Sequence, residues 1–255
     1  MNNLIDSPLY VFLLSFFALW LAARIGASFA TAMQLAADAR EDFGVVLAAT
    51  LTLLGLIIGF SFSMAINRYD QRKNYEEAEA NAIGTEYLRA GLLPAADAAK
   101  VRALLRNYLD QRVLFYATRD EQQLREINAR TAQLQTELWS AVQVPAVAQP
   151  SVPIALVVAG MNDVLNSEGY TQAAWWNRIP AAAWGLMAAI AICCNLLIGY
   201  GVRRPKAEAV LLLVLPLVVS ISFLLIADID SPRGGLIRVK PQNLVAVVES
   251  LRRNP

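Results

Sequence analysis

Histidine is absent from this sequence of 255 residues, and cysteine occurs only twice. Because histidine is the commonest general base and metal ligand in proteins, its absence removes the usual candidates for both roles. Cys193 and Cys194 are adjacent, and neighbouring cysteines would form a strained disulfide and lack the spacing of a metal site. No nucleophile motif occurs either. We therefore expect that the protein is not an enzyme and has no catalytic residue, metal or cofactor.

Charge of either sign gives no indication of a nucleic-acid partner. The chain has 22 Lys and Arg against 21 Asp and Glu, a net charge of +1, and its arginines form no basic stripe. Charged residues make up only 17% of the sequence, whereas hydrophobic residues make up 56%, with a mean hydropathy of +0.42. Few soluble proteins have such a composition, so it indicates a membrane protein whose first partner is the lipid bilayer.

Four apolar runs account for this composition. The clearest covers residues 43–67, which are 25 residues without a charge. As a helix this run would measure roughly 37 Å, more than the ~30 Å hydrocarbon core of a bilayer. It stops at Arg68, beyond which the same helical pattern continues in polar form. Residues 179–202 and 209–227 are also long enough to span the membrane.

The first run is interrupted by Arg24. Residues 7–23 would reach only about 26 Å, and a second apolar stretch follows over 25–31. Either the helix is short and Arg24 extends to the headgroups, or the helix continues and Arg24 faces protein. An arginine at the membrane centre costs at least ~2.5 kcal/mol, which favours the first alternative. The first ten residues contain Asp6 but no Lys or Arg, so we expect an uncleaved anchor helix rather than a signal peptide.

The polar segment over residues 68–178 is predicted to be a helical insert between two membrane hairpins. Its expected helices are the continuation of the second span to Gly91, then 94–116, 120–142 and 154–166, with a break at the prolines 145, 150 and 153. Trp175 and Trp176 are predicted to anchor the chain at the membrane interface. Asn195 is predicted to make an interhelical hydrogen bond and Pro216 to kink the fourth span.

These elements define an all-α membrane protein with four transmembrane helices in two hairpins. The expected parts are residues 1–67, 68–178, 179–227 and the tail 228–255, together forming one integrated domain. Placing the insert in the cytoplasm assigns seven Lys and Arg near the span ends to the cytoplasmic side and five to the other side, which favours that orientation. The cluster of Arg203, Arg204 and Lys206 favours the opposite orientation.

A polar cluster follows the second span directly. It consists of Arg68, Tyr69, Asp70, Arg72, Glu76 and Asn81. Arg72 and Glu76 are spaced as a helix-surface ion pair, and one interpretation of the cluster is simply a solvated face with weak pairs. Small residues at 78, 80, 82 and 84 instead favour a helix packed tightly in a bundle.

Five sequence blocks carry a family resemblance. They are GFSFSMAINRYDQR (59–72), EANAIGTEYLRAGLLP (79–94), NRIP (177–180), Gly199-Tyr200, and LLIADIDSPRGGLIRVKPQNL (224–244). In this order they span nearly the whole chain. The sequence resembles the bestrophin-like domain family of uncharacterised bacterial membrane proteins, distant relatives of the bestrophin anion channels.

The resemblance implies a ring of identical subunits in the bacterial inner membrane, with the second span lining a pore. Leu56, Phe60 and Met64 would then form the pore-lining face, although lipid or core contacts are the ordinary alternative. Animal bestrophins sense calcium through acidic residues after the fourth span, where this chain has only Asp228 and Asp230. A calcium ion takes roughly six to eight oxygen ligands, and two carboxylates supply too few of them. Calcium control is therefore not expected.

Two functions follow as hypotheses. The first is an oligomeric, multi-pass ion channel that conducts small anions. The second is a non-conducting membrane scaffold or regulatory protein whose helical insert binds a partner. The absence of charged residues within the second, third and fourth spans is compatible with both.

Overall fold

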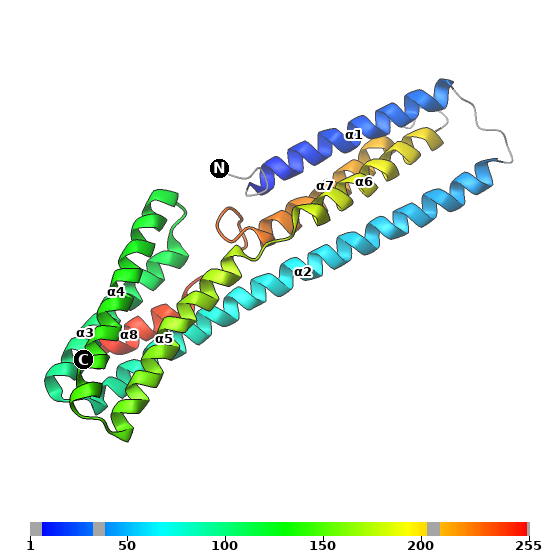
Figure 1. The fold of residues 1–255 in the computed structure, drawn as a ribbon. Helices are drawn as coiled ribbons and strands as arrows, with labels where there is room; N and C mark the ends of the chain where they lie inside the picture. The colour runs from blue at the N-terminus through cyan, green and yellow to red at the C-terminus, as the bar shows by residue number, and fades with distance from the viewer. Residues whose placement is uncertain (1–6, 33–38, 203–209, 254–255) are drawn as a thin grey trace. The chain divides into compact units, whose positions relative to one another are not determined.

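The computed structural model describes residues 7–32, 39–202 and 210–253, and every regular element in these ranges is helical (Figure 1). The elements are α1 (Pro8–Ala32), α2 (Ala39–Arg89), the 3-10 helix η2 (Ala90–Leu92), α3 (Ala95–Ala117), α4 (Glu121–Ala148), α5 (Val152–Trp176), α6 (Ala181–Gly201), α7 (Leu211–Asp230) and α8 (Gln242–Arg253). Four helical stretches of the described chain are long and apolar enough to cross a membrane. The predicted all-α fold with four spans is confirmed.

The chain divides into two compact units. Unit 1 comprises residues 1–68 and 178–238 and holds α1, the first part of α2, α6 and α7. Unit 2 comprises residues 69–177 and 239–255 and holds the rest of α2 with η2, α3, α4, α5 and α8. The second apolar run and the polar stretch after it are therefore parts of one helix, α2, that contributes to both units.

Within unit 1, α1 and α6 approach each other at two glycines. A Cβ atom added at Gly199 would lie 2.0 Å from the carbonyl oxygen of Ala23, and one added at Gly26 would lie 2.1 Å from that of Leu196. Both distances are far below van der Waals contact, so only glycine fits at either position. Close backbone approach at small residues is how helices pack in lipid, where apolar side chains gain little from burial.

The first span differs from the favoured expectation. Because α1 continues to Ala32, Arg24 lies within the helix and not at its end. Its side chain is exposed, and its guanidinium carbon lies 5.9 Å from the centre of the Trp20 ring. The helix therefore runs on, but Arg24 does not face the interior of its own subunit.

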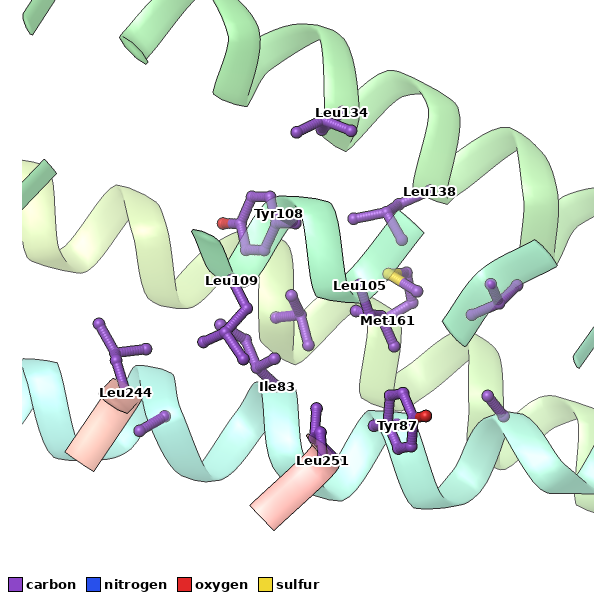
Figure 2. Packing of buried hydrophobic residues seen from close by; sticks show 14 of the residues in the cluster. Ile83, Tyr87, Leu105, Tyr108, Leu109, Leu134, Leu138, Met161, Leu244 and Leu251 are labelled. Atoms are coloured by element: carbon purple, nitrogen blue, oxygen red, sulfur yellow. The ribbon is translucent and has the colours of Figure 1, made fainter. Parts of the chain in front are cut away.

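Unit 2 has one hydrophobic core to which every helix of the unit contributes (Figure 2). Its labelled members are Ile83 and Tyr87 of α2, Leu105, Tyr108 and Leu109 of α3, Leu134 and Leu138 of α4, Met161 of α5, and Leu244 and Leu251 of α8. Burial of such side chains is worth about 1.5–3 kcal/mol each, which makes this core the main source of stability for the unit.

Two helices of unit 2 are longer than the sequence pattern indicates. Helix α4 continues through Pro145 to Ala148, because a single proline removes one backbone donor without ending the helix. Helix α5 begins at Val152, where the hydroxyl of Ser151 accepts a hydrogen bond from the backbone N–H of Ile154, and runs to Trp176. The sequence pattern predicted that this helix ends near Asn166.

Three further expectations need correction or lie outside the described residues. Trp175 is not an interfacial anchor, because it is buried against Phe115 and Tyr116 in the core of unit 2, whereas Trp176 is exposed. The amide of Asn195 donates to the carbonyl oxygen of Ala191 in its own helix, 2.8 Å away, and not to a neighbouring helix. The basic cluster Arg203, Arg204 and Lys206 lies outside the described residues.

Candidate functional site

Most positions along the membrane half of α2 are exposed or only partly buried. Leu54, Ser61 and Ala65 are buried. The predicted pore-lining residues Leu56, Phe60 and Met64 are exposed, over 52%, 62% and 42% of their surface. Their spacing of four residues brings them together along one side of the helix. Three large apolar side chains are thus available to lipid, to a pore or to another subunit, and their lining role stays a prediction.

The predicted polar cluster after the span is not one site, and Arg68 belongs to unit 1. Its Nη1 lies 3.8 Å from a carboxylate oxygen of Asp230 at the end of α7. The Asp230 carboxylate also accepts a hydrogen bond from the backbone N–H of Ile179, at 3.1 Å, and one from Nε of Arg178, at 3.4 Å. Asp230 therefore joins the end of α7 to the start of α6 and to α2.

The next members of the cluster serve unit 2. Arg72 is buried and donates to the carbonyl oxygens of Ala174 at 3.3 Å and Asn177 at 3.4 Å, which places its charge at the carboxyl end of α5. A cation there compensates the partial negative charge of the helix end. Tyr69 packs against the core, whereas Asp70 and Asn81 are exposed.

Glu76 holds the amino end of the C-terminal helix α8. Its carboxylate accepts hydrogen bonds from the backbone N–H groups of Asn243 and Leu244, both at 3.0 Å, and from the side-chain amide of Asn243 at 2.6 Å. These donors belong to the first turn of α8, whose N–H groups have no partner within the helix. The carboxylate supplies that partner and a favourable charge.

The most deeply buried charges, which the sequence interpretation missed, surround Glu79. This carboxylate accepts from Nε of Arg112, from the hydroxyl of Tyr116 at 3.1 Å and from the hydroxyl of Thr171 at 3.3 Å. Burial, reinforced by the charge of Glu79, raises the pKa of the Tyr116 phenol well above its usual range, so Tyr116 stays a neutral donor. One carboxylate thus joins α2 to α3 and α5.

A spacing pattern in the sequence would have revealed these groups. Arg72, Glu76, Glu79, Ile83 and Glu86 follow one another at intervals of four, three, four and three residues, and all five are buried. Such spacing is typical of the packed side of a helix. Four of the five positions carry a charged residue type, which hides the pattern from a search for apolar periodicity.

The two aspartates after the fourth span are bonded to the protein itself. Asp228 accepts from the backbone N–H groups of Leu236 at 2.7 Å and Ile237 at 2.8 Å, and so closes the loop that follows α7. Among the described residues, no group of three or more acidic, histidine or cysteine side chains gathers in a metal-binding arrangement. The carboxylates of Asp228 and Asp230 act as anchors for backbone and arginine groups.

The fold and this tail define a four-span helical membrane protein with a helical insert. The sequence profile of the Bestrophin-like domain family matches residues 11–244, and the chain belongs to that family. No curated protein matches the sequence.

Solved structures confirm the relationship at the level of the fold. A tryptophan-to-alanine variant of a bacterial bestrophin homologue from Klebsiella pneumoniae matches with a TM-score of 0.61 at 15% identity, covering 100% of this chain and 97% of its own. Another structure of that homologue gives a TM-score of 0.61 at 15% identity and covers 96% of both chains. The protein thus shares its fold with this bacterial bestrophin homologue.

Proposed function

We propose that the protein is an oligomeric anion channel whose second span lines the pore. The observation that carries this proposal is that three large apolar side chains, Leu56, Phe60 and Met64, are exposed along one side of α2. A ring of such side chains would form a narrow apolar constriction, which can gate ion flow by excluding water. Membership of the Bestrophin-like domain family supports the same proposal.

Beyond the span, the exposed side of α2 is polar. Asp70 and Asn81 are exposed there, and in a ring they would face a wide inner vestibule that ions cross in hydrated form. The proposal places the pore in the bacterial inner membrane with unit 2 in the cytoplasm. It also requires several copies of the chain, since one exposed helix face cannot enclose a pore.

Two measurements on the purified protein test the proposal. The first is the mass of the protein in detergent, which for a ring is a multiple of the 27.9 kDa subunit. The second is anion flux into liposomes containing the protein. A monomer without flux would overturn the proposal, and a stable oligomer without flux would favour the non-conducting scaffold instead.

The variant Phe60→Ala connects flux to the proposed face. Phe60 is exposed in the subunit, so its truncation should change conductance while the oligomer remains intact. Leu54→Ala is the matched control on the same helix, because Leu54 is buried and its loss should reduce the amount of folded protein. Unchanged flux in Phe60→Ala would contradict the proposal that this side of α2 lines the pore.

A further inference from the structure

Glu86 is a buried carboxyl group without a hydrogen-bond partner. It lies on α2 in unit 2, well beyond the apolar run that ends at Asn67. Its side chain is 0% exposed, and neither carboxyl oxygen has a hydrogen-bond partner. Glu76 and Glu79, on the same side of the same helix, each accept several hydrogen bonds. Glu86 is therefore the exception on this face.

The space for this carboxyl group is provided by Gly160 of α5. A Cβ atom at position 160 would lie 2.1 Å from Oε2 of Glu86 and 2.5 Å from Nη1 of Arg89. A larger residue at this position would therefore displace the ends of both side chains. The missing side chain of Gly160 thus leaves the space, called the recess below, that the Glu86 carboxyl group and one edge of the Arg89 guanidinium occupy.

The charged groups around the recess are few. Arg89, on the same helix, favours the ionised form of Glu86, while Asp163 of α5 disfavours it. The arginines of α3 are engaged elsewhere: Arg102 donates to the carbonyl oxygen of Tyr87 at 3.3 Å, and Arg106 donates to the hydroxyl of Tyr87 at 2.5 Å. Among the described residues, no hydrogen bond or ion pair joins Arg89 to Glu86.

An ionised carboxylate in such a place loses its hydration and gains no donor in return, which is costly. Protonation removes the charge and therefore most of that cost. Burial is the largest effect on this group and raises the pKa of Glu86 from 4.5 to about 8, although Arg89 acts in the opposite direction. The group would then be neutral at physiological pH.

We propose that Glu86 and the space left by Gly160 form a proton-binding site, and that binding of this proton stabilises the packing of α2 against α5 within unit 2, an effect that is lost as the pH rises. The ligand is a single proton, bound as the carboxylic acid. This site is independent of ion conduction, and it would make the stability of unit 2 fall as the pH rises from acid to about 8, whether or not the protein is a channel.

The sign of the pH effect follows from the direction of the pKa shift. Between pH 4.5 and about 8, the folded state keeps a proton that the unfolded state releases. Stability contributed by the protonated group is therefore complete below pH 4.5 and is lost as the pH rises to about 8. Above that pH, Glu86 adds no further dependence.

The first test compares thermal unfolding of the full-length protein and its variant Glu86→Gln in detergent. Glutamine keeps the shape of the protonated group but cannot ionise, so the variant should lose part of the decrease in Tm that the wild type shows between about pH 5 and 8. Glu77→Gln is the matched control, because Glu77 is exposed on the same helix and should keep the wild-type profile. An equal pH profile in Glu86→Gln and wild type would overturn the proposal.

The second test observes the proton directly and does not require the Glu86→Gln variant to fold. Infrared difference spectra of the wild type and of Glu77→Gln should show the carbonyl band of a protonated carboxyl group at pH 6, and this band should disappear as the pH is raised through 8. If the carbonyl band instead appears only at acid pH, near the ordinary pKa of glutamate, then Glu86 is ionised at neutral pH. That result would overturn the proposal.

Discussion

The carboxylate of Glu79 accepts a hydrogen bond from Nε of Arg112, and both side chains are 0% exposed in the interior of unit 2. The two residues lie 33 positions apart and come from α2 and α3. Arg112 also lies with its guanidinium carbon 4.4 Å from the centre of the Phe115 ring. The pair therefore joins two helices at a point where no water can replace either partner.

Removing one member of this pair should destabilise unit 2 strongly. In Arg112→Met the Glu79 carboxylate would remain buried without its cation, and breaking such a pair typically costs about 3–5 kcal/mol. Thermal or denaturant unfolding in detergent measures the effect. The control is Glu137→Gln, which removes the exposed pair of Arg130 and Glu137, 3.7 Å apart with 41% and 38% of the side chains exposed. That change should cost less than about 1 kcal/mol, and equal losses would contradict the prediction.

The attachment of α8 should depend on Glu76. In Glu76→Gln the charge is lost and one acceptor oxygen is replaced by a donor, so the first turn of α8 loses part of its cap. We expect a loss of about 0.5–2 kcal/mol and faster proteolysis near the start of α8. Glu249→Gln is the control, because Glu249 is exposed within α8 and forms an exposed pair with Arg253, at 3.8 Å. Identical proteolysis of both variants would show that Glu76 does not hold the helix.

The contact between α1 and α6 should not tolerate a methyl group at Gly199. The added Cβ would meet the Ala23 carbonyl oxygen, so Gly199→Ala should force the helices apart and destabilise unit 1 by about 1–3 kcal/mol. Gly185→Ala lies on the same helix with no atom within 4 Å of its added Cβ. This control should be neutral or slightly stabilising, because alanine favours the helix. The yield and Tm of the two variants distinguish the outcomes.

Asp228 should contribute stability through its own backbone contacts and not through calcium. Asp228→Asn leaves one of the two N–H groups of Leu236 and Ile237 without its acceptor, which should cost about 1–3 kcal/mol. Addition of calcium or of a chelator should leave the Tm of the wild type unchanged. A rise in Tm with calcium that Asp228→Asn abolishes would show instead that the loop binds the ion.

Sequence patterns were sufficient to locate the membrane spans, because the hydropathy of a helix depends only on its own residues. The run that ends at Asn67, and the runs that became α6 and α7, needed no knowledge of neighbours. The same patterns failed at Trp175, which looks like an interfacial aromatic but is buried beside Phe115 and Tyr116. Its environment depends on α3, which no local pattern of α5 contains.

The polar residues after the span were recognised as a group, but their partners could not be predicted. Arg72 bonds to a carbonyl group 102 residues away, and Glu76 bonds to a helix 167 residues away. Local spacing indicated an ion pair between the two, since they lie four residues apart. The actual partners depend on how α5 and α8 pack against α2, which is a property of the folded unit.

The charged residue types on the packed side of α2 also have a consequence for biosynthesis. In the newly made chain, before α3, α5 and α8 exist to cover them, Arg72, Glu76, Glu79 and Glu86 make the second half of α2 too polar to enter lipid. Their charges add to those of Arg68, Asp70 and Lys73, at which the hydrophobic run ends. The residues that later bind the helices of unit 2 together thus first help to keep the second half of α2 out of the lipid.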